Sequence, residues 1–486
     1  MKKVLIAGLF LGVSGCSFAP TYTRPDLPTA AQYREKTAEE GHWVPFKPTA
    51  ETARTWWKAF HDPVLDDLEH SGLAANQNLL AALARLDQGR SLAREQWANL
   101  WPVIGASATH QKTKISEHTM IFPVQNYPAF QTNQVQLDLN YELDIWGALR
   151  NAAHAADAQA RASADDLATL ALSTEAEIAL DYESLRALDV ELSETEKLVN
   201  SWADNRTLTA VLVTGAEAAT PDQAQADLNW QVARQQLNEL RLQRERMEHA
   251  LALLVGSNPE EFHIAPVAAE LPTPLHPVPG MPSILLERRP DVVSAEEKVK
   301  AANANIGVAK AAWFPVFNLT AYSGYGNTGY GPLMVAPNRL WSFGPTLSLP
   351  LFNGGQIAAA NDLARAQWEE SVANYRNTVL EAWREVEDQL AALRELEEEA
   401  EAARGASKAA QLALEQARLR FEGGLANRFD VLQAERTAAL ALTGATQLRL
   451  RALASSIVLV KALGGGWSDS DSSDAAKPHS PAGAPS

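Results

Sequence analysis

The chain has 486 residues, 46% of them hydrophobic and 21% charged, a composition typical of a folded protein with one large or several ordinary domains. Its formal net charge of −17 argues against a nucleic-acid partner, because that affinity rests on cationic contacts with phosphate. A single cysteine excludes an internal disulfide.

The N-terminus has the layout of a bacterial export signal. Two lysines precede an apolar stretch, Val4–Val13, that is too short to cross a membrane as a mature helix. Small residues then lead to the only cysteine, Cys16, in an order that resembles a lipobox. The resemblance predicts that residues 1–15 are a signal peptide, that Cys16 is acylated, and that Ser17, in place of aspartate, directs the lipoprotein to the outer membrane. An ordinary signal peptide with a chance cysteine is the alternative.

The rest of the chain repeats itself at a period near 208 residues. Glu177-Ile178 recurs as Glu385-Val386, and Gln225-Ala226 recurs as Gln433-Ala434. A period this long indicates a duplicated half and not a solenoid of small units. The predicted organisation is a lipidated N-terminal segment (16–62), a first repeat (63–256), a proline-rich linker (257–283), a second repeat (284–466) and a disordered tail (467–486).

Each repeat contains one very long helix. Between Gly147 and Gly215, and again between Gly355 and Gly423, lie 67 residues without proline, broken by glycine only at Gly405. At 1.5 Å per residue each helix is about 100 Å long, too long for a compact domain, so it must pack lengthwise on partners as a coiled coil. An apolar stripe from Ile357 to Phe421 advances about 3.6 residues per step, which suits such packing. Shorter helices are predicted over 64–100, 216–255, 290–313 and 425–463.

Four segments are predicted to be strands. Gln134–Ile145 alternates polar and apolar residues without a fault, which suits a strand with lipid on one face and water on the other. A half-buried strand of a soluble sheet alternates in the same way and is the alternative. The other three predicted strands are Val103–Lys112, Val316–Tyr325 and Leu340–Leu351.

Four strands leave open edges, which a lipid environment does not tolerate. The chain must therefore pool its strands with copies of itself. An eight-stranded barrel from two copies fills with side chains, whereas twelve strands from three copies leave an open lumen. Because Asp138, Glu142 and Asp144 are expected to face inward and need water, three copies are favoured. No later segment has about 20 uninterrupted apolar residues, so no transmembrane helix is expected.

Patterns that suggest enzyme chemistry have simpler explanations. Gly324–Gly329 fits GxGxxG, but no helix follows, so we interpret it as an outer loop between two strands and not as a dinucleotide site. The ten histidines include no HxH or HExxH spacing, so neither a metal nor a cofactor is expected. No nucleophile–base spacing stands out, and an enzyme is disfavoured. A run of glutamates from Glu395 to Glu401 is interpreted as a solvated helix face, with pore lining as the minority interpretation.

Five motifs together resemble the TolC-like outer-membrane efflux channels, specifically their NodT-like lipoprotein branch. They are Leu285-Leu286-Glu287-Arg288-Arg289-Pro290-Asp291, Ala301-Ala302-Asn303-Ala304-Asn305-Ile306-Gly307, Trp341-Ser342-Phe343-Gly344-Pro345, Leu349-Pro350-Leu351-Phe352-Asn353-Gly354-Gly355 and Lys461-Ala462-Leu463-Gly464-Gly465-Gly466-Trp467. The resemblance implies an α+β membrane protein, a homotrimer with a 12-strand outer-membrane barrel and a 12-helix periplasmic tunnel. It also implies a periplasmic adaptor protein and a proton-driven inner-membrane pump as partners.

The resemblance further implies where the partners meet the channel. In that family the helix tips farthest from the membrane dock the adaptor and close the tunnel. The corresponding tip residues here are Gly215, Gly423, Gly424 and Leu425, and the corresponding gate residues are Phe429, Asp430, Gln433 and Arg436. Relatives often have aspartate where Gln433 stands, which leaves a charge-based lock in doubt. The implied function is a passive export duct for drugs or other small toxic molecules. A duct for peptide or protein secretion remains the alternative, as does a structural coiled-coil lipoprotein without a pore.

Overall fold

The computed structural model describes residues 17–27, 33–35, 44–46, 55–116, 128–277, 288–465 and 467. The chain divides into two compact units, each made from parts of both sequence repeats. The first comprises Met1–Pro25, Leu86–Ser163 and Ala295–Tyr375, and the second comprises Asp26–Arg85, Ala164–Ser294 and Arg376–Ser486. Cys16, with the predicted signal peptide, lies outside the described residues.

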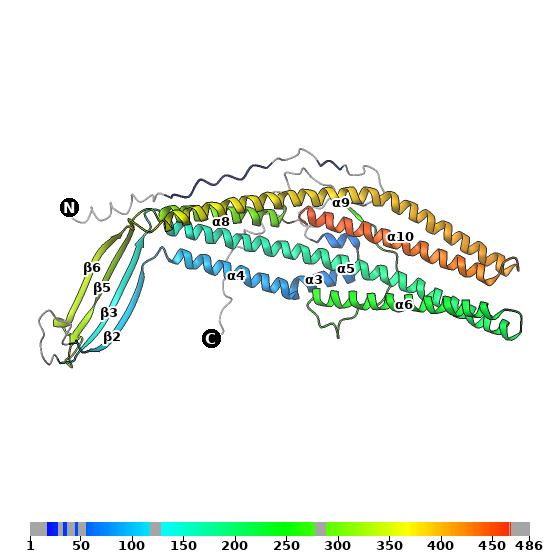
Figure 1. The fold of residues 1–486 in the computed structure, drawn as a ribbon, viewed down its shortest axis with the longest axis horizontal. Coiled ribbons are helices and arrows are strands. Elements are labelled where there is room, and N and C mark those ends of the chain that lie inside the picture. The colour runs from blue at the N-terminus through cyan, green and yellow to red at the C-terminus, as the bar shows by residue number, and fades with distance from the viewer. Residues whose placement is uncertain are drawn as a thin grey trace. The chain divides into compact units, whose positions relative to one another are not determined.

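The two long helices follow the glycine boundaries read from the sequence. Helices α5 (Ala148–Thr214) and α9 (Gln356–Glu422) have 67 residues each. The return helices α6 (Thr220–Leu254) and α10 (Arg428–Ala462) have 35 residues each, and all four keep the 208-residue offset of the duplication (Figure 1). Helix α8 spans Pro290–Ala311. No helix in the described ranges is both long and apolar enough to cross a membrane.

The helix predicted over 64–100 is two helices, α3 (Pro63–Ala75) and α4 (Gln77–Ala98). Asn76 separates them with an extended backbone, ψ 121°. Its side-chain oxygen accepts hydrogen bonds from the N–H groups of Asn78 and Leu79, at 2.9 and 3.2 Å. The asparagine therefore ends one helix and caps the next, as its short polar side chain favours.

The first unit contains a four-stranded antiparallel sheet in the order β2-β3-β5-β6 (Figure 1). Its strands are β2 (Val103–Thr113), β3 (Phe130–Leu143), β5 (Val316–Thr328) and β6 (Arg339–Ser348). Among the described residues, β2 pairs only with β3 and β6 only with β5, so each leaves one edge free. Large apolar side chains of the sheet are solvent-exposed in a single chain, including Ile104 and Phe343 at 69% and 65%.

Two expectations for the strands were wrong. Strand β3 ends at Leu143, and Asp144 lies in the short connection before α5 instead of facing inward on the strand. Its carboxylate accepts hydrogen bonds from the backbone N–H groups of Leu149 and Arg150, which the first turn of a helix leaves free. The GxGxxG segment is also not a loop, since β5 continues through Thr328.

Gly324 is required inside β5 by close packing. A Cβ atom at this position lies only 2.1 Å from the carbonyl oxygen of Val135 on β3. Glycine is therefore the residue that lets these two strand backbones approach.

The second unit is built around a core shared by five helices and a small sheet. Trp56 of the 3-10 helix η1 (Trp56–Phe60), Ile178 and Tyr182 of α5, and Ile457 of α10 are fully buried there. Strand β1 (Val44–Phe46) pairs in parallel with β4 (Leu275–Pro277). The linker between residues 262 and 274 forms neither helix nor strand.

The predicted apolar stripe of α9 is confirmed over its first half only. Its side chains between Ala364 and Leu396 are largely buried within the chain, and Val379 and Val386 are fully so. Beyond Ala400 the stripe is half-buried or exposed, and Phe421 is 39% exposed. The C-terminal half of α9 thus has apolar surface that the described part of one chain does not cover.

Buried carboxylates accompany the core. Glu69 is fully buried, and neither carboxyl oxygen has a hydrogen-bond partner among the described residues. Burial, then Glu175 and Asp66, raise the pKa of Glu69 to about 10. Burial also raises the pKa of Glu175 to about 7, although a hydrogen bond from the Trp56 indole opposes it.

Because the pKa of Glu69 is higher in the folded protein than in the unfolded chain, the folded protein binds more protons at any pH between these two pKa values. The free energy of unfolding therefore falls as pH rises from about 4.3 toward neutrality, by about 1.4 kcal/mol for each pKa unit crossed. We expect thermal denaturation, followed by helical circular dichroism, to occur at lower temperature at pH 8 than at pH 5. Glu69→Gln should flatten that slope, and an unchanged slope would refute the assignment to Glu69.

Candidate functional site

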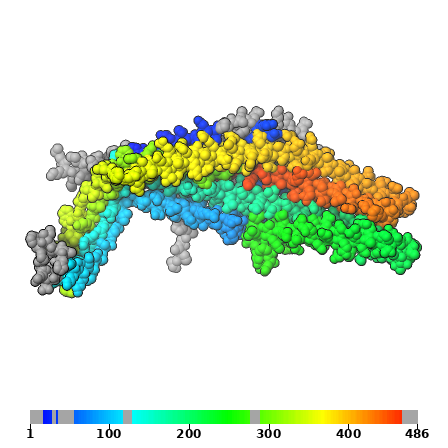
Figure 2. Space-filling model, in the orientation of Figure 1, coloured from blue at the N-terminus to red at the C-terminus, as the bar shows by residue number. Residues whose placement is uncertain are grey.

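The two helical hairpins of the second unit end in matching tips. The turn 215–219 joins α5 to α6, and the turn 423–427 joins α9 to α10. Most tip residues are solvent-exposed, and both tips are visible at the surface in Figure 2. The tip residues predicted from the sequence, Gly215 on one hairpin and Gly423, Gly424 and Leu425 on the other, all lie in these turns.

The second tip is a helix stop closed by its own backbone. The Gly423 N–H donates to the Leu419 carbonyl at 3.0 Å, and the Leu425 N–H reaches back to the Arg420 carbonyl at 2.7 Å. Between them Gly424 adopts φ +70°, the left-handed conformation that glycine adopts without steric strain. A Cβ atom on Gly424 meets nothing within 4 Å, so its outer side is open.

The first tip has the same geometry with different residues. Gly215 donates to the Val211 carbonyl at 2.9 Å, as Gly423 does to Leu419, and Glu217 donates to Leu212 at 2.8 Å. The left-handed residue here is Ala216, with φ +58°, and not the neighbouring glycine, Gly215. The duplication therefore conserves the turn, while alanine introduces strain where the second repeat has glycine.

This difference gives a test within one molecule. Ala216→Gly should raise the free energy of unfolding by about 0.5–1 kcal/mol, and Gly424→Ala should lower it by about 1 kcal/mol, because only glycine takes a positive φ without strain. Chemical denaturation followed by circular dichroism measures both. Gly423→Ala is the control, since that residue does not have a positive φ. Equal effects of Gly423→Ala and Gly424→Ala would contradict the assignment.

Helix α10 begins with a reciprocal cap. Asn427 Oδ1 accepts from the Asp430 N–H at 2.8 Å, and Asp430 Oδ2 accepts from the Asn427 N–H at 3.1 Å. Asp430, predicted as a gate residue, therefore stabilises the start of the helix in a single chain. On α6, Asp222 makes one half of this box with the Ala219 N–H, because alanine has no side-chain acceptor.

The other predicted gate residues lie on the first turns of α10. Phe429 is 46% exposed and Leu425, at the tip, is 75% exposed. Gln433 is half-buried and Arg436 is exposed, and neither side chain makes a hydrogen bond or ion pair within the described part of the chain. All four residues, Phe429, Asp430, Gln433 and Arg436, thus share one short helical segment.

Each hairpin also has an ion pair between its two helices that was not predicted from the sequence. Arg418 of α9 pairs with Glu435 of α10 at 3.0 Å, and Arg206 of α5 pairs with Asp227 of α6. Glu435 and Asp227 occupy equivalent positions of the two repeats, but their arginine partners do not, so the 208-residue offset marks only the carboxylates. Near the second pair, the guanidinium groups of Arg206 and Arg234 each lie 4.5 Å from the Trp230 ring.

Comparison with known proteins identifies this architecture. The family model described as "Outer membrane efflux protein" matches residues 69–257 and 281–465. The chain belongs to the outer membrane efflux protein family. The TolC-like resemblance predicted from the sequence motifs is confirmed.

The relatives match over nearly their whole length. The toluene efflux pump outer membrane protein TtgC of Pseudomonas putida is 30% identical, and 96% of each chain is covered. The outer membrane protein OprJ of Pseudomonas aeruginosa is 33% identical with the same coverage. The structure of the outer-membrane channel OprN superimposes with a TM-score of 0.82 at 28% identity, covering 93% of this chain and all of OprN.

These matches establish the class of protein. The chain is the outer-membrane channel component of an efflux system and extends into the periplasm. It combines helices of a tunnel with strands, as its structural neighbours do, and it acts as a passive channel and not as an enzyme.

Proposed function

We propose that the chain is the outer-membrane duct of a three-part efflux system that removes organic solvents, antibiotics or similar small toxic molecules. The observation that carries the proposal is the full-length similarity to TtgC, a toluene efflux component. The antibiotic efflux pump outer membrane protein ArpC of Pseudomonas putida is equally similar, at 30% identity over 96% of each chain. The partners of the duct are a periplasmic adaptor and an inner-membrane, proton-driven pump.

The duct is proposed to be a homotrimer with a 12-strand barrel and a 12-helix tunnel. The free edges of β2 and β6 support this assembly, because unpaired strand edges need a partner in lipid. The uncovered apolar surface of α9 supports it as well. Native mass measurement in detergent should give three copies, and a stable monomer or dimer as the sole species would overturn the assembly.

Cys16 is proposed to carry the lipid anchor. The residues that follow are fixed in the first unit, which suits an anchor held beside the strands. The Phe18 ring stacks on Phe314 and Trp146, with centroid distances of 4.4 and 6.0 Å, and Ser17 hydrogen-bonds to Asn151 at 3.0 Å. Mass spectrometry of the mature N-terminal peptide should find acyl chains on Cys16. An unmodified thiol in the mature protein would refute the proposal.

The adaptor is proposed to dock at the two tips, around Gly215 and around Gly423, Gly424 and Leu425. Exposure of Leu425 and open space around Gly424 support docking. Phe429, Asp430, Gln433 and Arg436 are proposed to form the periplasmic gate, with contacts from neighbouring copies. The absence of intrachain partners for Gln433 and Arg436 among the described residues supports that role.

Susceptibility of cells tests the proposed cargo. Deleting the gene should increase killing by toluene and by antibiotics, and the wild-type gene should restore growth. Unchanged susceptibility together with loss of a secreted peptide or protein would contradict the proposal and favour the secretion alternative.

A further inference from the structure

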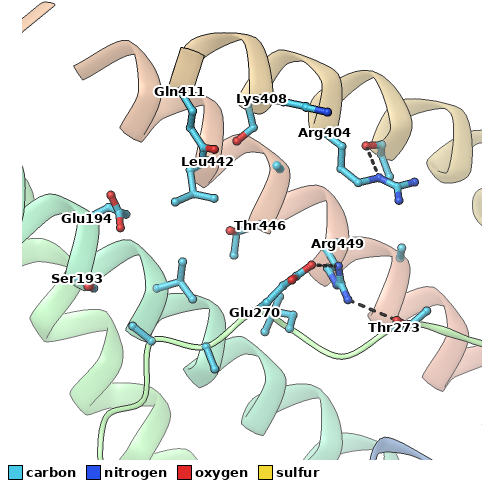
Figure 3. Close-up of a pocket in the computed structure, with 18 of the residues that line it drawn as sticks. Ser193, Glu194, Glu270, Thr273, Arg404, Lys408, Gln411, Leu442, Thr446 and Arg449 are labelled. Atoms are coloured by element: carbon cyan, nitrogen blue, oxygen red, sulfur yellow. Dashed lines mark hydrogen bonds and ion pairs between the residues drawn. The ribbon is translucent and has the colours of Figure 1, made fainter. Parts of the chain in front are cut away.

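A cavity of about 680 Å³ lies in the second unit beside the linker (Figure 3). Four segments line it: α5 around Ser193, the linker around Glu270, α9 around Lys408 and α10 around Thr446. Its volume is in the range of sites for drug-sized molecules, about 300–1,000 Å³. None of the predicted tip or gate residues lines it.

The cavity combines an apolar wall with hydroxyl groups that lack partners. Val190, Leu271 and Leu442 supply apolar surface. Ser407 and Thr446 are 7% and 9% exposed, and neither hydroxyl hydrogen-bonds to another described residue. Elsewhere on these helices buried hydroxyls donate to a carbonyl one turn back, as Thr174 does to Leu170 at 2.9 Å. Two hydroxyl groups are thus open to the cavity and available to hydrogen-bond to a bound molecule.

The charges of the lining favour an anion by a single excess charge, because four basic side chains face three carboxylates, of which Glu397 belongs to α9. Lys197 pairs with Glu194 at 2.6 Å, Arg404 pairs with Glu401 at 2.9 Å, and Arg449 pairs with Glu270. Lys408 is the lining cation that makes no ion pair or hydrogen bond to a described residue. The ammonium group of Lys408 is therefore free to pair with a ligand anion.

Comparison with the first repeat shows that the basic and hydroxyl residues of the cavity are particular to the second hairpin and are not shared by both hairpins. Glu196 and Arg241 stand 208 residues before Arg404 and Arg449, and they form an ion pair at 2.8 Å. The second repeat replaces this neutral pair with two arginines. Val199 stands at the position of Ser407 and packs against the apolar cluster of α5 and α6. The equivalent level of the first hairpin therefore has one arginine in place of two and lacks the serine hydroxyl.

We propose that this cavity binds a small organic anion, a carboxylate or sulfonate on an apolar body of one or two rings. The anionic group pairs with Lys408 and accepts hydrogen bonds from Ser407 and Thr446, while the apolar body packs on Val190 and Leu442. The bound molecule contacts the linker, α5, α9 and α10 at once. This site is additional to the duct, and its occupation does not depend on which compounds pass through the tunnel.

Thiol protection in the full-length protein tests the site without adaptor or pump. Ala400→Cys and Ala445→Cys each place one thiol in the lining of the cavity without removing a proposed ligand contact, and the rate of modification by N-ethylmaleimide is measured for each. The probes are 2-naphthalenesulfonate and the matched cation 2-naphthylmethylammonium. The wild-type chain controls for Cys16, and Leu425→Cys, on the exposed tip, controls for direct effects of the probes on the reagent.

The sulfonate is expected to slow modification of both cavity thiols, whereas the ammonium probe and the tip thiol show no protection. Lys408→Gln in the same background should weaken protection about tenfold, because one charge-assisted contact is lost. Calorimetric titration of the sulfonate into the wild-type chain and into Lys408→Gln repeats the comparison without introduced thiols. Absence of binding, equal protection by both probes, or binding unchanged by Lys408→Gln would overturn the proposal. Susceptibility of cells is a separate measurement, so failure here leaves the export function standing.

Discussion

Replacing Gly424 by tryptophan is expected to reduce the resistance of cells to exported compounds to the level of a strain without the channel. Gly424 lies at the turn between α9 and α10, where the open space around its missing Cβ lets another protein approach the backbone. An indole there blocks that approach, while the trimer still assembles and inserts. Growth in the presence of toluene or antibiotics and co-purification of the adaptor should fall together.

The backbone geometry of Gly424 supplies the matched control. Gly424→Ala has the same penalty of a positive φ, about 1 kcal/mol, but adds one methyl group only. Cells with the Gly424→Ala protein should keep nearly normal resistance, which separates the effect of side-chain bulk from the effect of backbone strain. Normal resistance with normal amounts of the Gly424→Trp protein would remove the docking proposal and leave a simple helix stop.

Arg244→Met is expected to lower the free energy of unfolding by about 3 kcal/mol, the lower end of the cost of breaking a buried ion pair, because Asp189 keeps Arg186 as a partner at 2.9 Å. Arg244 is 8% exposed and pairs with Asp189 at 2.7 Å and with Glu248 at 3.0 Å. It also donates to the Ile264 carbonyl of the linker at 2.7 Å. Asp189 further accepts from the Val267 N–H at 2.9 Å, so the same cluster of charges fixes the linker to α5 and α6.

Arg241→Met is the control for this variant. Arg241 lies on the same helix and pairs with Glu196, but the two side chains are 53% and 49% exposed. An exposed pair contributes about 1 kcal/mol or less, so the change should be small. Guanidinium denaturation followed by circular dichroism gives both values. Similar losses in the two variants would show that burial of the Arg244 cluster is not what stabilises the linker.

The two sides of the linker are held differently. Arg244 and its carboxylates hold residues 264–267 against the first hairpin. On the other side, Arg449 of α10 pairs with Glu270 and donates to the Pro272 carbonyl at 3.1 Å. Between these anchor points the linker lines the cavity, so Arg244→Met should also make the cavity thiols react faster with maleimide.

The candidate site was predictable in its position and less so in its details. Glycines bounding 67 residues without proline placed the tips, because glycine ends helices and proline was absent between them. Ala216 was not predicted to adopt a left-handed conformation, since alanine rarely does so and nothing in the local sequence marks it. The capping role of Asp430 follows from a local pattern, an asparagine three residues before an acidic residue, although the family resemblance implies a gate at this position.

What the sequence determined by itself is the periodic part of the molecule: the duplication, the two long helices and the strands. Periodicity and helix breakers act locally, so they can be read residue by residue. What only the tertiary structure decided depends on residues far apart in the chain. Gly324 is needed because another strand passes within 2.1 Å of its missing Cβ. The Arg244 cluster and the cavity beside the linker likewise join segments from several elements, and no local pattern records such contacts.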